Sequence, residues 1–85
     1  MGSYRVVVAR SAEKEIERLP RTVRVRVVEK ILALAGNPRP HGSQKLTAED
    51  KYRIRQGDYR IVYTIQDDIL TVTVVRAAHR GDVYR

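Results

Sequence analysis

The sequence predicts a small α+β domain in the order β-α-α-β-β-β, in which a small antiparallel sheet carries a helical hairpin on one face. Three observations support this fold class. A short valine-rich run opens the chain, two amphipathic segments separated by Pro20 follow, and three alternating runs joined by short turns come last. Helices grouped in one stretch and antiparallel strands in another are typical of α+β domains. The 85 residues are expected to form a single domain spanning 1–85.

A strand over residues 4–9 and a helix capped by Ser11 are expected at the start of the chain. The strand is predicted from its β-branched residues, and serine is a favourable N-cap. Apolar residues then recur at helical spacing, at Ala12, Ile16 and Leu19. Pro20 ends this helix and can begin the next, because proline is tolerated in a first helical turn.

Residues 21–35 begin with a strand-like alternation, but the longer window favours a helix. One apolar stripe contains Val23, Val27, Ile31 and Leu34, and is widened by Val28, Leu32 and Ala35. Gly36 supplies a C-terminal stop. Residues 37–50 contain two prolines and a glycine, so we expect a loop there.

A predicted hairpin over residues 51–63, with Gly57-Asp58 as a two-residue turn, is the centre of the fold. The cross-strand pairs are then Gln56 with Tyr59, Arg55 with Arg60, Ile54 with Ile61, Arg53 with Val62 and Tyr52 with Tyr63. Because side chains alternate along a strand, isoleucine and tyrosine gather on one face, and the basic residues gather on the other. Like charges directly opposite each other are destabilising. The pair Arg55 and Arg60 therefore predicts an anion, in preference to a merely solvated face, and guanidinium groups suit phosphate.

A second turn at Asp67-Asp68 is expected to lead into a strand over residues 70–76. The predicted pairs are Ile65 with Leu70, Tyr63 with Val72, Ile61 with Val74, Thr64 with Thr71 and Val62 with Thr73. The first three pairs fall on the isoleucine and tyrosine face of the first hairpin, which supports the register. The result is a three-stranded meander that the helices cover on this face and that the first strand completes.

The charge balance favours an anionic partner. Seventeen lysines and arginines oppose ten acidic residues, which gives a net charge of +7, and thirteen of the basic residues are arginine. Such a balance is typical of proteins that bind nucleic acid or an acidic protein. The chain has no cysteine and two well-separated histidines, so we expect no metal and no cofactor. No apolar run reaches the length of a membrane span, so we expect a cytoplasmic protein without membrane contacts.

Two motifs carry a resemblance to a known family. They read YRIR…GDYRIVY over residues 52–63 and HRGDVYR over residues 79–85. Together with the order of elements, they resemble the RelE/ParE superfamily of bacterial and archaeal toxins, and its RelE branch in particular, over essentially the whole chain. The resemblance implies a microbial-ribonuclease-like fold and a toxin of a type II toxin–antitoxin module that cleaves mRNA in the ribosomal A site. It also implies a cognate antitoxin that wraps the toxin, with operator DNA bound only through that antitoxin.

The resemblance also implies roles for particular residues. Matching positions give a catalytic set of Arg53, Arg55, Arg60, His79, Arg80 and Tyr84, and we expect RNA contacts from Lys45, Lys51 and Arg76. The first-strand pair is lysine in the best-known branch. Arginine stays protonated, so Arg53 and Arg55 are poor bases and are expected to hold the phosphate and stabilise its charge. His79 is a candidate acid or base, or alternatively a structural histidine at the strand end.

Three functions follow as alternatives. The first is a metal-independent endoribonuclease, in which the RNA 2′-hydroxyl attacks the adjacent phosphate. The second is a non-enzymatic toxin of the ParE type that binds and inhibits DNA gyrase. The third is a degenerate member of the family that survives as a binding module.

Overall fold

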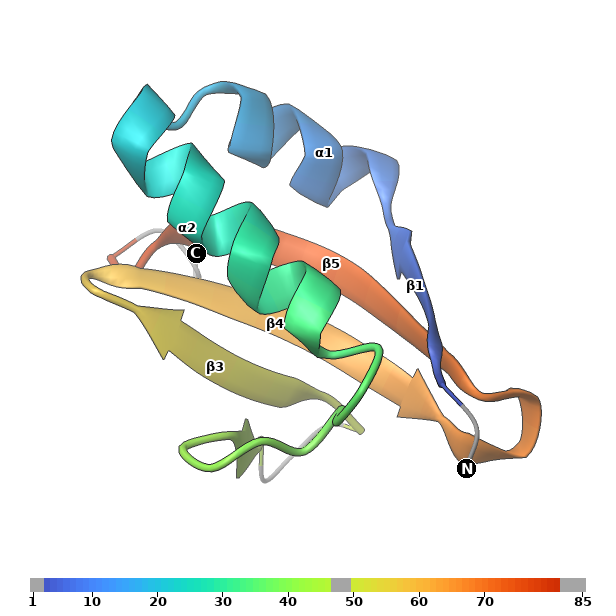
Figure 1. Cartoon of the computed structure of the whole chain (residues 1–85). Helices are drawn as coiled ribbons and strands as arrows, with labels where there is room; N and C mark the ends of the chain where they lie inside the picture. Colours follow the sequence, from blue (N-terminus) through green and yellow to red (C-terminus); the bar gives the residue numbers. More distant parts are fainter. Residues whose placement is uncertain (1–2, 47–49, 82–85) are drawn as a thin grey trace.

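A five-stranded sheet covered on one face by two helices makes up the fold (Figure 1). The structure is a computed structural model that describes residues 3–46 and 50–81. The elements follow the order β1 (Arg5–Val8), α1 (Arg10–Glu17), α2 (Arg21–Ala33), β2 (Gln44–Lys45), β3 (Tyr52–Gln56), β4 (Tyr59–Gln66), the 3-10 turn η1 (Asp67–Ile69) and β5 (Thr71–His79). The predicted α+β class is confirmed, and β2 is an additional short strand inside the predicted loop. No helix in the described part of the chain is long and apolar enough to cross a membrane.

The sheet is mixed rather than purely antiparallel. Its strands lie in the order β1-β5-β4-β3-β2, and β1 runs parallel to β5, whereas the other neighbours are antiparallel. The sequence predicted an antiparallel sheet, and this prediction is wrong at the edge where β1 pairs with β5. Parallel neighbours need a long crossover connection. Here that connection contains both helices and the first hairpin, so the first strand pairs with the last.

Helix α2 packs its predicted stripe on the sheet. Val27, Ile31 and Leu34 are at most 2% exposed and belong to the main core cluster. Val28 and Leu32 were expected to widen the stripe, but they are 36% and 63% exposed. Each residue turns the helix by about 100°, so the neighbour of a core-facing residue points well away from the sheet. The buried stripe is consequently narrower than predicted.

Helix α1 lies beside the part of β5 that continues beyond its pairing with β1. The Ser11 hydroxyl donates to the carbonyl oxygen of Val75 at 3.1 Å. The backbone N–H of Ala77 donates to Glu15 Oε1 at 3.0 Å. Ser11 was predicted as the N-cap, but the N-cap is Ala9. Ser11 and Glu15 are one helical turn apart, so both can reach the same strand edge and take the place of a neighbouring strand.

The turn between β4 and β5 shifts the predicted register by two residues. The chain makes the 3-10 turn Asp67–Ile69, and Leu70 follows at φ 47°. The pairs formed are Ile65 with Val72, Tyr63 with Val74 and Thr64 with Thr73. The predicted pairs are therefore wrong. A shift of two residues nevertheless keeps each side chain on its face, and both valines are fully buried as expected.

A β-bulge interrupts the pairing of β4 with β5. The flanking pairs are Tyr63 with Val74 and Val62 with Arg76. Val75 is consequently an extra residue without a cross-strand partner. An extra residue reverses the alternation of side chains along the rest of the strand. Each side chain in the second half of β5 therefore points to the opposite face of the sheet from the one that it would reach in an uninterrupted strand.

An ion pair ties the loop after α2 to the turn before β5. Arg39 donates to both carboxylate oxygens of Asp67, at 3.2 and 2.9 Å. The Tyr4 hydroxyl donates to the same carboxylate at 2.5 Å. The bond from Arg39 and then the bond from Tyr4 lower the pKa of Asp67 from its usual 3.8 to about 2. Three segments that are distant in the sequence are thus joined at one carboxylate.

We expect Asp67→Asn to be less stable than the wild type at neutral pH, by a margin that shrinks in acid. The folded pKa lies below the unfolded one, so the ionised carboxylate stabilises the fold fully above about pH 4. That contribution is lost as the pH falls through about 2. Urea unfolding between pH 7 and pH 2 measures the margin. Asp68→Asn, in the same turn, is the control, and a margin that is independent of pH would contradict the assignment.

Candidate functional site

The β3–β4 hairpin has the register that the sequence predicts. Gly57 adopts φ 60°, the left-handed conformation that a tight hairpin turn requires. Arg55 lies directly opposite Arg60. The intervening residues Ile54 and Ile61 are buried in the core, so the arginines project from the opposite side of the sheet. The outward surface of Lys51, Arg53, Arg55 and Arg60 is called the arginine face below.

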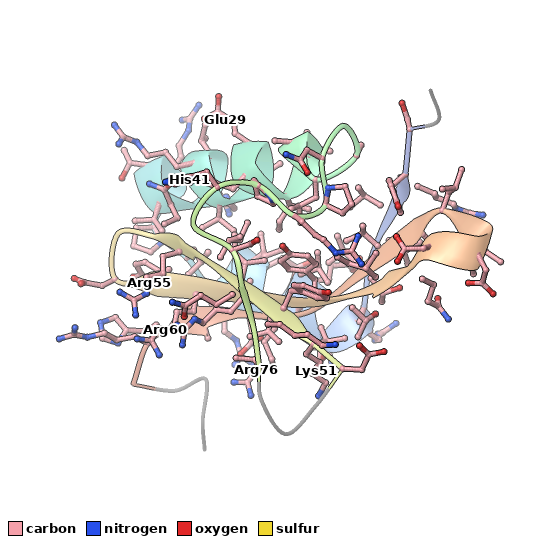
Figure 2. All side chains as sticks on the ribbon, turned by 90° about the horizontal axis from the view of Figure 1, so that it is seen from below. Glu29, His41, Lys51, Arg55, Arg60 and Arg76 are labelled. Carbon is pink, nitrogen blue, oxygen red and sulfur yellow. The ribbon has the colours of Figure 1, made fainter. Side chains whose placement is uncertain are left out.

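The arginines of this face have different surroundings. Within residues 3–46 and 50–81, the exposed Arg55 guanidinium has no hydrogen-bond partner. Arg53 and Arg60 are half-buried, and Arg53 donates to the amide oxygen of Gln44 on β2. Figure 2 shows Arg55 and Arg60 near one end of the hairpin and Lys51 near the other. The face therefore offers a pair of neighbouring guanidinium groups at the turn end.

A small apolar cluster forms the base of the arginine face. Val62 and Ala78 are 4% and 8% exposed, and they pack with Leu46 and Val75. Val62 is the cross-strand neighbour of Arg53, and Ala78 is the neighbour of Arg60. Apolar surroundings lower the local dielectric and strengthen an ion pair. An anion held here is consequently bound more strongly than on a fully solvated surface.

Arg80 lies beside the hairpin turn. Its backbone N–H donates to the carbonyl oxygen of Asp58 at 2.8 Å, directly after the end of β5. This places the exposed Arg80 at the same end of the sheet as Arg55 and Arg60. The structure thus brings four of the predicted basic residues to one region of the sheet. They are Arg53, Arg55, Arg60 and Arg80.

His79 lies on the opposite side of the sheet from the arginine face. It is the cross-strand neighbour of Tyr59, with the two rings edge to face at 5.6 Å between centroids. Tyr59 alternates with Arg60 and shares the helix side of β4. The Nδ1 atom of His79 accepts a bond from the backbone N–H of Gly81 at 3.3 Å, so the neutral ring carries its proton on Nε2. The structure therefore does not bring His79 to the candidate phosphate site.

Arg76 is held by helix α1. Its guanidinium makes a bidentate ion pair with Glu15, with a closest distance of 2.9 Å, and both side chains are partly buried. Glu15 also accepts from the next backbone N–H of β5, so this pair fastens the helix at the bulge. Removing one partner of such a pair leaves a desolvated charge. Arg76 has a structural partner that the predicted role in RNA binding did not anticipate.

The remaining predicted residues differ in their relation to the arginine face. Lys45 is opposite Tyr52, which places it on the helix side, and its Nζ atom is 3.9 Å from Asp50. Lys51 precedes β3 on the arginine face and is half-buried. Tyr84 lies outside the described residues. Within the described ranges, no three histidine or carboxylate side chains gather closely enough to hold a metal ion.

The sequence analysis missed Gln44, which contacts Arg53, and Glu15, which contacts Arg76. Gln44 lies in a two-residue strand, which is too short to give an alternating pattern. Glu15 does have a signal, since it follows Ser11 at a spacing of four on the predicted helix. That spacing shows which residues share a helix face, but it does not show that the face meets a strand edge.

Comparison with known proteins places the chain in a family. Residues 6–84 match the family model described as the ParE toxin of the type II toxin–antitoxin system parDE. The chain is 32% identical to Toxin RelE of Mycobacterium tuberculosis, over 96% of this chain and 87% of that protein. It is 31% identical to Toxin RelG of the same organism, over 96% of this chain and 97% of that protein. The toxin–antitoxin complex RelBE2 of M. tuberculosis contains a chain with TM-score 0.82 and 30% identity, covering 92% of this chain and 99% of that chain.

The named relatives and the fold agree with the two sequence motifs. Both curated relatives are toxins, and the structural match extends over nearly the entire length of both chains. The chain therefore belongs to the RelE/ParE superfamily of toxins from type II toxin–antitoxin systems.

Proposed function

We propose that the toxin is an mRNA endoribonuclease whose arginine face holds the scissile phosphate. The observation that carries this proposal is the direct pairing of Arg55 with Arg60 on an outward face. Like charges in this position destabilise the free sheet, and a bound phosphate relieves their repulsion. The RelE names of the relatives support RNA as the source of that phosphate.

In the proposed reaction, the RNA 2′-oxygen attacks the adjacent phosphorus and the bond to the 5′-oxygen breaks. The 2′-hydroxyl loses its proton and the leaving 5′-oxygen gains one, which gives a 2′,3′-cyclic phosphate and a 5′-hydroxyl. Arg55 and Arg60 stabilise the charge that builds on the equatorial oxygens, with Arg53 and Arg80 beside them. Arginine does not give up its proton near neutral pH, so none of the four arginines is assigned a proton transfer. A role for Tyr84 remains a prediction.

Two partners belong to the same proposal. The substrate is mRNA presented in the ribosomal A site, as the RelE resemblance implies. The protein partner is a cognate antitoxin, because a similar chain forms the toxin–antitoxin complex RelBE2. Operator DNA is then contacted through the antitoxin and not through the toxin itself.

Inhibition of DNA gyrase is the second candidate function, because the matching family model carries the ParE description. A translating extract with a reporter mRNA separates the two activities when it is run beside a gyrase supercoiling assay. Primer extension that shows new 5′ ends only when the toxin is present supports the ribonuclease. Intact mRNA together with inhibited supercoiling would support the ParE-like activity and would overturn our proposal. Repeating the assay with purified mRNA shows whether cleavage needs the ribosome.

We expect Gln44→Ala to reduce cleavage by about 10-fold, because Gln44 orients the Arg53 guanidinium. The measurement is the rate of cleavage for Gln44→Ala, Arg53→Ala and the double variant. If Gln44 acts through Arg53, the double variant is no slower than Arg53→Ala alone. Fully additive losses would contradict this positioning role.

A further inference from the structure

Beyond Val74, the outer edge of β5 is held by helix α1 instead of a neighbouring strand. Strand β1 pairs with β5 only from Thr71 to Val74. Helix α1 then lies alongside the rest of the strand (Figure 1). Among residues 3–46 and 50–81, no other strand reaches that edge. The position of the end of β5 therefore depends on contacts from α1.

Ser11 and Glu15 make these contacts at consecutive residues of β5. The Ser11 hydroxyl donates to the carbonyl oxygen of the bulged Val75 at 3.1 Å. The Glu15 carboxylate accepts from the backbone N–H of Ala77 at 3.0 Å. The same carboxylate accepts from the Arg76 guanidinium at 2.9 to 3.1 Å. Residues 75–77 of the strand are thus bound to about one turn of the helix.

The segment that α1 holds leads directly into the candidate phosphate site. Ala78, the residue after Ala77, is the cross-strand neighbour of Arg60. Arg80 follows Ala77 by three residues, which is about 10 Å of extended chain. The backbone N–H of Arg80 binds the carbonyl oxygen of Asp58 in the hairpin turn. A displacement of this part of β5 would therefore move Arg80 relative to Arg60.

We propose that Glu15 is a positioning residue for the candidate nuclease site. It acts through the backbone of β5, which it holds so that Arg60 and Arg80 converge on one phosphate. Misplacing a reacting group by about 1 Å can cost two orders of magnitude in rate. This inference rests on the proposed ribonuclease function, and it adds a residue of α1 to the groups on which cleavage depends.

Positioning and fold stability predict different results when Glu15 is removed. The side chains of Glu15 and Arg76 are 22% and 32% exposed, and an ion pair with so little exposure repays little beyond its own desolvation. Removing Glu15 also removes a negative charge, so binding of RNA should not weaken. A positioning role therefore predicts slower cleavage by folded protein that still binds its substrate.

Cleavage of a reporter mRNA in the translating extract tests this on the intact chain. We expect Glu15→Ala to lower the rate at saturating toxin by about 10-fold or more. The toxin concentration for half-maximal rate should stay within about 3-fold of the wild-type value. Glu15→Gln keeps an acceptor for the Ala77 N–H and should regain part of the lost rate. Glu17→Ala removes the same charge from an exposed position on α1 and should cleave at the wild-type rate.

Two further variants separate positioning from stability at a temperature where circular dichroism shows each to be folded. Ile31→Ala weakens the core under α2 but leaves the contacts of Ser11 and Glu15 in place, so it should cleave at the wild-type rate. Ser11→Ala removes only the bond to Val75 and should slow cleavage by about 3-fold. It tests the same edge if Glu15→Ala does not fold.

Amide hydrogen exchange supplies a measurement that does not depend on activity. The Arg80 amide should exchange about 10-fold faster in Glu15→Ala than in the wild type, and at the wild-type rate in Ile31→Ala. Unchanged exchange, or a loss of cleavage that Ile31→Ala shares, would overturn the positioning role. Equal saturating rates for Glu15→Ala and an active wild type would overturn it too and leave the proposed function standing. A wild type that cleaves no mRNA would overturn the proposed function, and the positioning role with it.

Discussion

Replacing Arg60 by alanine is expected to slow mRNA cleavage by about 100-fold or more and to abolish growth arrest on overexpression. Arg60 stands directly opposite Arg55, above the apolar base formed by Val62 and Ala78. Removing one preorganised donor from a developing anionic charge typically costs two to three orders of magnitude in rate. Primer extension on a reporter mRNA measures the rate, and colony formation after induction measures the arrest.

Two controls separate loss of chemistry from loss of fold. The melting temperature of Arg60→Ala, measured beside that of the wild type, shows whether the variant is folded under the conditions of the assay. Arg24→Ala, on α2 and therefore on the helix side of the sheet, should cleave at the wild-type rate. Growth arrest by Arg60→Ala equal to that of the wild type would show that the arginine face does not act on RNA.

Replacing Ile31 by alanine is expected to cost about 3 kcal/mol of unfolding free energy. Ile31 is 2% exposed and belongs to the core cluster between α2 and the sheet. Truncating a buried isoleucine loses transfer free energy and leaves a cavity, for about 2–5 kcal/mol in total. A domain of this size has about 5–15 kcal/mol of stability to lose. Chemical denaturation with the two-state analysis gives the value directly.

The adjacent residue supplies the matched control for Ile31. Leu32 is 63% exposed, and Leu32→Ala should change stability by less than about 0.5 kcal/mol. The two variants remove side-chain atoms from neighbouring positions on one helix. Equal losses would show that α2 does not face the sheet in the orientation described.

The first hairpin could be predicted in full from the sequence because several local signals agree there. Gly57 suits the tight turn, and the alternation of Ile54 with Arg53 and Arg55 fixes which face is buried. A slip of one residue would bury the arginines, so only one register is compatible with a core. The arginine face follows directly from that register.

The position of His79 could not be predicted, because it depends on the bulge. Uninterrupted alternation from Val72 and Val74 would carry residue 79 to the arginine side. The extra residue Val75 reverses the alternation and carries His79 to the helix side. No glycine or proline marks this bulge in the sequence. The 3-10 turn before Leu70 could not be predicted either, because it places Leu70 at a positive φ, which leucine rarely adopts.

The pairing of the first strand with the last has a consequence for synthesis on the ribosome. Strand β1 has no partner until residues 71–74 have emerged, and the helices have no sheet to cover until β4 and β5 exist. Contacts between distant segments also close slowly, because the chain entropy must be overcome first. We therefore expect the nascent chain to stay unfolded until translation of the domain is nearly finished. Assembly of the sheet is then expected to wait for β5, the strand that lies between β1 and β4.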